Sequence, residues 1–171
     1  MENELIEFES RIFQLEYLLN VNYVEIPADI IAKLGGNMKQ RVLCTINGQL
    51  TFQSGFMALG EGKAYVTVNK LRMKQLKLRT GDPVAIRLQK DESEYGMAMP
   101  EELSELLKID DLGSERFEQL SPGKQRWMIY YISQVKSSQL RIDRAILILD
   151  YLKSVAPGRL DFREMMGMDP R

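Results

Sequence analysis

Short segments in which hydrophobic and polar residues alternate fill the first half of the chain. The segments "NYVEI" (22–26) and "AYVTV" (64–68) are rich in β-branched and aromatic residues, which is typical of strands. Asn47-Gly48 separates "RVLCTI" from "QLTFQSGF", and Asn-Gly between two such runs is typical of a tight hairpin turn. The pattern therefore predicts a first domain, residues 1–96, built from short strands joined by tight turns.

The period of the hydrophobic residues becomes helical after Pro100. Proline followed by two glutamates suits the first turn of a helix, and Ser121-Pro122 repeats that start with serine as the N-cap. Two apolar stripes with helical spacing follow, Met128, Tyr131, Ile132 and Val135 in the first and Ile142, Ala145, Ile146, Leu149 and Leu152 in the second. Residues 97–160 are therefore predicted to form a small domain of about three helices, and residues 161–171, which lack a period, a flexible tail.

The strand-rich part contains an internal repeat. Residues 23–46 align without a gap on residues 65–88, an offset of 42, and the apolar positions agree along the alignment. Each copy is expected to form a strand, a short helix and a strand. Because one such unit cannot bury both faces of its strands, two copies are expected to close on each other as a β-barrel. A single chain would then complete the barrel, which favours a monomer and leaves a dimer open.

Several motifs of the chain resemble known families. "VEIPADIIAKL" and "LKLRTGDPVAIRL" resemble the swapped-hairpin, double-split barrel of the AbrB and MazE class. "MPEELSELL", "FEQLSPGKQR" and "VKSSQLRIDR" are similar to motifs of the bacteriocin-protection family, also called YdeI or OmpD-associated. "YVEIP", "ING", "GKAYVTVNK" and "GDPV" are similar to motifs of the N-terminal barrel domain of unknown function that often precedes it. The resemblance implies an α+β protein of two domains, located in the bacterial cytoplasm and linked to bacteriocin or envelope-stress tolerance. It implies no particular reaction.

Composition restricts the chemistry open to the chain. Histidine is absent and Cys44 is the only cysteine, so Ser-His-Asp and Cys-His catalysis, most zinc sites and an internal disulfide are excluded. The net charge of −1 gives no overall attraction to nucleic acid or to an anionic membrane, and no stretch has the roughly 20 apolar residues of a membrane span. We expect a cytoplasmic protein that is not an enzyme and that needs no metal or cofactor.

Two groups of basic residues are candidate sites. Residues 63–90 contain eight lysines and arginines against Asp82 alone, and five of them, Lys70, Arg72, Lys74, Lys77 and Arg79, are candidate contacts for nucleic-acid phosphates. The first copy of the repeat lacks most of these cations, and no aromatic residues are interleaved to stack on bases. The same stretch therefore also fits a solvated face of the barrel.

The second candidate is an anion site in the helical part. A helix that starts at Ser121 presents free backbone N–H groups beside basic side chains, and further cations come close if the helices fold back as a hairpin. The candidate residues are Ser121, Lys124, Arg126, Lys136, Arg141 and Arg144. An ordinary N-cap with exposed basic residues explains the same pattern.

Three classes of function remain open. The leading hypothesis is a non-enzymatic binding protein with an unknown protein partner, and the alternative is a regulator that binds nucleic acid through residues 70–79. An enzyme acting on a small anionic substrate is the third, although the sequence offers neither an acid/base pair nor a nucleophile for it.

Overall fold

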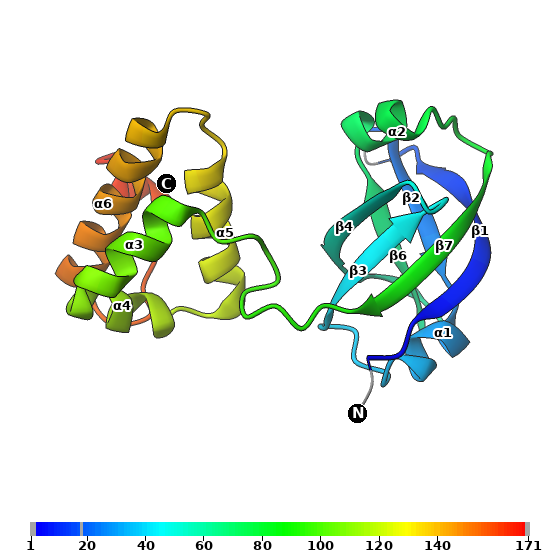
Figure 1. The fold of residues 1–171 in the computed structure, drawn as a ribbon, viewed down its shortest axis with the longest axis horizontal. Helices are drawn as coiled ribbons and strands as arrows, with labels where there is room; N and C mark the ends of the chain where they lie inside the picture. Colours follow the sequence, from blue (N-terminus) through cyan, green and yellow to red (C-terminus); the bar gives the residue numbers. More distant parts are fainter. Residues whose placement is uncertain (1–2, 18, 170–171) are drawn as a thin grey trace. The chain divides into compact units, whose positions relative to one another are not determined.

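The computed structural model describes residues 3–17 and 19–169, and the chain divides into two compact units, Met1–Gly96 and Met97–Arg171 (Figure 1). We call them the sheet unit and the helical unit and describe each by itself. The elements of the sheet unit are β1 (Ile6–Leu15), β2 (Val21–Ile26), α1 (Ala28–Lys33), β3 (Arg41–Ile46), β4 (Leu50–Gly55), β5 (Met57–Gly60), β6 (Lys63–Val68), α2 (Lys70–Leu76) and β7 (Pro83–Lys90). The predicted mixture of helices and strands in two domains is confirmed.

The strands of the first unit form one antiparallel sheet in the order β4-β3-β7-β1-β2-β6-β5. The two strands at the ends of this order, β4 and β5, are consecutive along the chain and are separated only by Phe56, so the sheet curls around its inner face. Alternate residues of β3 and β7 point inward, and α1 and α2 add apolar side chains to the same core. The hairpin at Asn47-Gly48 has the two positive φ angles, 53° and 63°, that such a turn requires.

Two segments of the sheet unit have the same order of elements. β6, α2 and β7 each begin 42 residues after β2, α1 and β3. β2 pairs with β6 so that Val24 lies opposite Val66, and β3 pairs with β7 so that Thr45 lies opposite Arg87. The two residues of each pair are also 42 apart, so each strand meets its counterpart at the equivalent residue.

The helical unit contains α3 (Glu101–Ile109), α4 (Asp111–Glu118), α5 (Pro122–Ser133), α6 (Ser138–Ser154) and α7 (Phe162–Met165). α6 contacts each of the other four helices, and its buried stripe is Ala145, Ile148, Leu149 and Leu152. Ile146, expected in that stripe, is instead 43% exposed, and Ile148 takes its place. The described residues thus form more helices than the three or so predicted, because the short α4 and α7 have no strong apolar period of their own.

The last described residues, up to position 169, contain α7. Its Met165 is buried, and the ring of Phe162 lies edge-on to Trp127 of α5, with 5.4 Å between the ring centroids. Trp127 also stacks on Tyr131, so three aromatic rings hold α7 against α5. This packing was not apparent in the aperiodic sequence, where we predicted a flexible tail.

Asp110 joins three helices of the second unit and provides a testable contribution to its stability. Its Oδ1 accepts a hydrogen bond from the N–H of Gly113 at 2.8 Å, which caps α4, and its Oδ2 accepts one from Nζ of Lys153 in α6 at 2.7 Å. We expect Asp110→Ala to lower the free energy of unfolding by about 1 kcal/mol through the lost cap. Asp110→Asn retains the cap and is expected to lose less. Urea unfolding followed by tryptophan fluorescence measures both.

The pH dependence of this contribution has a defined sign. The hydrogen bond from Lys153, and next the one from the Gly113 N–H, lower the pKa of Asp110 below its ordinary value of 3.8. Stability gained from a lowered carboxyl pKa is complete above the unfolded pKa and is lost as pH falls through the folded one. Asp110→Asn should therefore cost most above pH 3.8 and progressively less below it. An equal cost at all pH values would contradict this assignment.

Candidate functional site

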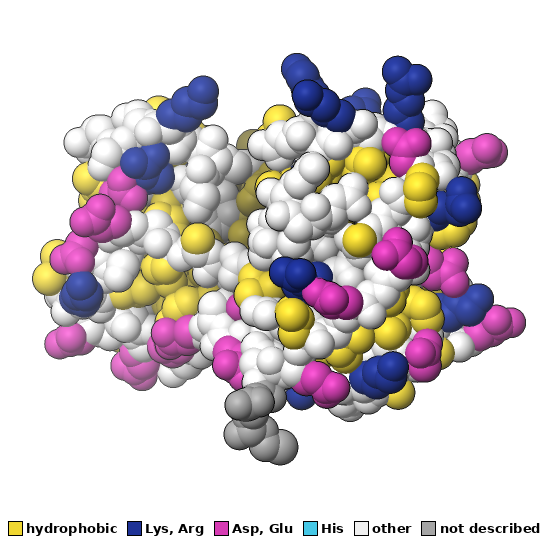
Figure 2. Space-filling model, turned by 45° about the vertical axis from the view of Figure 1, so that its right-hand side comes forward, with side chains coloured by type: hydrophobic (Ala, Val, Ile, Leu, Met, Phe, Trp, Pro, Cys, Tyr) yellow, Lys and Arg dark blue, Asp and Glu magenta, His cyan; other side chains and the backbone are white. Residues whose placement is uncertain are grey.

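Five cations lie on α2 and the turn that follows it, and we call them the α2 cluster: Lys70, Arg72, Lys74, Lys77 and Arg79. The side chain of Asn69 caps the helix by accepting the N–H of Arg72, and Lys77, in the left-handed region with φ 53°, ends it. In Figure 2, lysine and arginine side chains gather at the top of the sheet unit, where Figure 1 places α2. These are the residues that the sequence proposed as phosphate contacts.

None of the five cations forms an ion pair with a carboxylate of the described residues within 4.0 Å. Two other basic side chains of the sheet unit do form ion pairs: Lys63 lies 3.4 Å from Glu25, and Arg87 lies 2.8 Å from Glu7. The α2 cluster therefore brings five cations together without an ion-pair partner among the described residues, although the carboxylate of Asp82 lies in the same turn and accepts the backbone N–H of Arg79 at 2.8 Å.

Arg72 occupies an unusual position in this cluster. Its guanidinium carbon lies 3.9 Å from the centroid of the Phe52 ring, a cation–π contact, and burial lowers the pKa of Arg72 below its ordinary value. The residue 42 positions earlier is Ile30, which is 5% exposed. Arg72 of the second strand-helix-strand segment thus takes the position that the aliphatic Ile30 has in the first segment.

The first strand-helix-strand segment serves as an internal comparison for the whole cluster. The positions 42 residues before the five cations are Ala28, Ile30, Ala32, Gly35 and Asn37, and none of them carries a charge. Helix α1 packs its buried side chains into the same core as α2 does. This architecture therefore forms without cations at these positions, which favours a role for them other than folding.

The six residues proposed as an anion site are not gathered at one place. Ser121, Lys124 and Arg126 lie at the start of α5, whereas Lys136 follows its end, and a helix of this length separates the two groups by about 18 Å. Ser121 is the N-cap, as predicted, and Nζ of Lys124 donates to the carbonyl of Gly158 at 2.8 Å.

The two arginines of α6 are engaged in holding helices together. Arg141 donates to Oε1 of Glu102 at 2.8 Å and to the backbone carbonyls of Val135 and Lys136 that follow α5. Arg144 donates to the carbonyl of Tyr131 at 2.7 Å and lies over its ring. These contacts satisfy carbonyls near the end of α5, so a structural role accounts for both residues.

A group of aromatic residues, which the sequence-based prediction missed, lies on the outer face of the sheet, where Phe13 is exposed, Tyr23 half-buried and Tyr65 buried by its neighbours. Phe13 of β1 stacks on Tyr23 of β2, with centroids 5.5 Å apart, and Tyr23 meets Tyr65 of β6 edge-on at 5.3 Å. Met57 of β5 lies opposite Tyr65 in the strand pairing. We call these four residues the aromatic face. Phe13 and Tyr23 lie next to the buried Ile12 and Val24 and so on the other face of their strands, whereas no alternation of burial marks Met57 or Tyr65.

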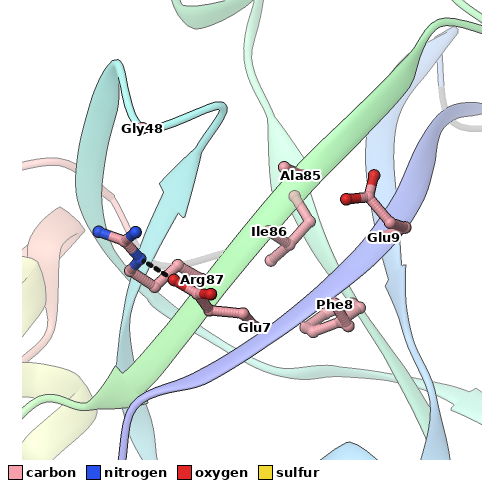
Figure 3. A pocket seen from close by; sticks show the side chains of 7 residues that line it. All are labelled: Glu7, Phe8, Glu9, Gly48, Ala85, Ile86 and Arg87. Atoms are coloured by element: carbon pink, nitrogen blue, oxygen red, sulfur yellow. Dashed lines mark hydrogen bonds and ion pairs between the residues drawn. The ribbon is translucent and has the colours of Figure 1, made fainter.

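The hollows of the sheet unit are shallow. One of about 200 Å³ lies on β1 and β7, and Figure 3 shows the ion pair of Glu7 with Arg87 beside it. It is smaller than the 300–1,000 Å³ usual for ligand pockets. A second, of about 430 Å³, lies beside Phe13 and is lined in addition by Glu9, Arg11 and Glu25. Within residues 3–17 and 19–169 no group of acidic or cysteine side chains is arranged to bind a metal ion.

Cys44 is an unreactive core residue. Its side chain is fully buried in β3, and burial raises its pKa to about 12. Because the thiolate is the nucleophile, we expect the native protein to resist a thiol reagent at pH 8, with modification following unfolding of the sheet unit in urea. Absorbance of the released thiol chromophore measures the rate. Rapid modification without denaturant would contradict the buried position.

The chain is a two-domain α+β protein, in which a curled antiparallel sheet is followed along the sequence by a small helical unit. Two family models match the chain, one in each unit. Residues 8–88 match the model described as Domain of unknown function (DUF1905), and residues 97–154 match the family described as Bacteriocin-protection, YdeI or OmpD-Associated. The second match supports the family that the motifs of the helical part predicted. No curated protein matches the chain.

No helix among the described residues has the length and apolar character needed to cross a bilayer.

Proposed function

We propose that this chain is a cytoplasmic, non-enzymatic binding protein that docks a protein partner on its aromatic face and contributes to tolerance of bacteriocins or envelope stress. The family match of the helical unit supports the link to protection. The observation that carries the binding role is the aromatic face, because Tyr, Phe and Met are enriched where proteins meet.

The aromatic face has the physical properties of a docking surface. Phe13 is 37% and Met57 53% exposed, although both are large and apolar. Stacking between the rings and their placement on paired strands fix the side chains, so a partner would lose little conformational entropy in ordering them. The hollow of about 430 Å³ beside Phe13 gives a partner side chain a place to enter.

We also propose that the sheet unit is a barrel of two duplicated halves that closes within one chain, in the manner of the AbrB and MazE class. The offset of 42 residues and the pairing of equivalent residues support it. β1 would belong to the repeat as well. The first part of β1 pairs with β7 and its last part pairs with β2. In the same way β4 pairs with β3, and β5, which follows it in the chain, pairs with β6. The change of partner falls at Ile12 in the first case and at Phe56 in the second.

The proposed binding role is tested by affinity capture from a native lysate with quantitative mass spectrometry. We expect a protein recovered with the wild type to fall at least tenfold with Phe13→Asp and Met57→Asp combined, since these charges oppose an apolar contact. Leu112→Asp, a change at a 46% exposed leucine of the helical unit, is the matched control and should retain the protein.

A bacteriocin challenge of a strain lacking the gene supplies the second readout. The wild type and the Leu112→Asp variant should restore survival, and the Phe13/Met57 variant should not. Equal capture and equal survival with all three proteins would refute the aromatic face as the binding surface.

A further inference from the structure

We propose that the end of the sheet unit formed by α2 and the β1–β2 turn binds the surface of an anionic lipid bilayer. The inference goes beyond the proposed function and rests on different residues. It follows from the cations of the α2 cluster, which form no ion pair within the described residues, together with three exposed apolar side chains at the same end, Tyr17, Leu19 and Leu71.

Strand pairing brings these side chains to one end of the unit. Leu15 pairs with Val21 at the mouth of the β1–β2 turn, and the next residue, Asn22, pairs with Val68, two positions before α2 begins. The Thr80 hydroxyl in the turn after α2 donates to Oδ1 of Asn22 at 2.9 Å. In Figure 1 the end of β1 and the start of β2 lie at the same end of the unit as α2.

The apolar residues at this end project into solvent. Leu19 is 93% exposed, Tyr17 78% and Leu71 64%. Leu19 has φ 52°, in the left-handed region that bulky residues seldom adopt, and Asn20 follows it with φ 58°. Leu19 thus combines an uncommon backbone conformation with a side chain that contributes nothing to the core.

Cations and exposed aliphatic side chains together match a bilayer surface. Anionic headgroups attract lysine and arginine, leucine side chains enter the boundary between headgroups and acyl chains, and tyrosine lies at headgroup level. A phosphodiester backbone would account for the lysines and arginines but not for Leu19 and Leu71. The observations therefore favour a lipid surface over the nucleic acid that the cations alone suggest.

The two strand-helix-strand segments provide a control inside the molecule. Helix α1 lies at the opposite end of the paired strands, because β2 enters it where β6 begins. The exposed Lys33 and Lys39 belong to that end and have no exposed leucine beside them in α1. Removing two lysines at either end lowers the net charge of the protein by the same amount. A difference in vesicle binding between the two variants would therefore show that binding occurs at one end of the unit.

The experiment is co-sedimentation of the full chain with vesicles of phosphatidylcholine alone or with one-third phosphatidylglycerol. We expect binding to the anionic vesicles that weakens with added salt. Lys74→Gln with Lys77→Gln should lower the partition coefficient about 25-fold, roughly fivefold for each lysine. Lys33→Gln with Lys39→Gln should leave it unchanged.

The apolar contribution is tested separately. Leu19→Ser with Leu71→Ser should lower the partition coefficient by about tenfold for each leucine. Ile109→Ser, at a 79% exposed position of the helical unit, is the matched control and should have no effect. All these positions are exposed, and coincident thermal melts will show that the variants fold as the wild type does.

Several results would overturn the proposal: no sedimentation with anionic vesicles, equal binding to neutral vesicles, or equal losses from the two lysine pairs. Binding of labelled DNA or RNA that needs Lys74 and Lys77 but not Leu19 and Leu71, without vesicle binding, would establish the nucleic-acid alternative instead. The Phe13/Met57 variant should bind vesicles normally, so failure of the docking surface and failure of the lipid surface are distinguishable.

Discussion

Phe117→Ala will lower the free energy of unfolding of the helical unit by about 3–5 kcal/mol. Phe117 is fully buried in α4 and is among the largest fully buried side chains of the molecule. Its removal deletes the transfer free energy of the ring and leaves a cavity that helices packed on both sides cannot fill. For a unit of this size, stabilised by about 0.05–0.15 kcal/mol per residue, the loss is a large part of the total.

Trp127, the only tryptophan of the chain, reports this transition because it lies in α5. Leu112→Ala changes a 46% exposed side chain of the same helix α4 and should move the urea midpoint of the fluorescence transition only slightly. The Cys44 modification curve should be the same in both variants, because that residue lies in the core of the sheet unit. Similar midpoints for Phe117→Ala and Leu112→Ala would contradict the assigned core.

Ile12→Ala should have the next largest effect, a loss of about 2–5 kcal/mol from the sheet unit. Ile12 is 1% exposed and lies where β1 leaves β7 and joins β2: Arg11 still pairs with Pro83, whereas Ile12 pairs with Val24. Its backbone also bonds to the turn before β7, accepting the N–H of Gly81 at 2.7 Å. The substitution therefore opens a cavity at the point that links two pairs of strands.

Cys44 is the readout for this variant. The urea concentration at which the thiol becomes modifiable should fall clearly for Ile12→Ala, while the Trp127 fluorescence transition stays in place. Phe13→Ala is the matched control, because it changes the next residue of β1 on the outer face and removes a side chain that is already 37% exposed. A larger loss for Phe13→Ala than for Ile12→Ala would reverse the assignment of inner and outer faces.

Local sequence signals predicted most of the elements that depend on local structure. The strand at "NYVEI", the Asn47-Gly48 hairpin and the helix starting after Ser121 are all present. β1 was harder to predict. Its buried positions change phase between Ile12 and Leu15, because the strand exchanges one partner for another, and the partner β7 begins more than 65 residues away.

The candidate sites also divide into those set by local sequence and those set by contacts between residues distant in the chain. The α2 cluster was predictable because consecutive residues of one short helix and its turn stay together in any fold. The arrangement of the proposed anion residues depends on three-dimensional contacts that the sequence does not contain: α5 separates its members, and Arg141 and Arg144 donate hydrogen bonds to backbone carbonyls. The aromatic face requires the pairing of β1, β2, β5 and β6, which no local pattern specifies.

The two ends of the sheet unit meet. The side-chain amide of Asn3 donates to the carbonyl of Lys90 at 2.7 Å, and the Lys90 N–H donates to Oδ1 of Asn3 at 3.1 Å. The polypeptide thus enters and leaves this unit at one point, next to the residues that lead to the helical unit. A unit whose ends are adjacent can be inserted into a loop or placed ahead of another domain without any change in its strand order. A circular permutant in which residues 3 and 90 are linked and the chain is opened at Asn47-Gly48 should therefore retain the same sheet.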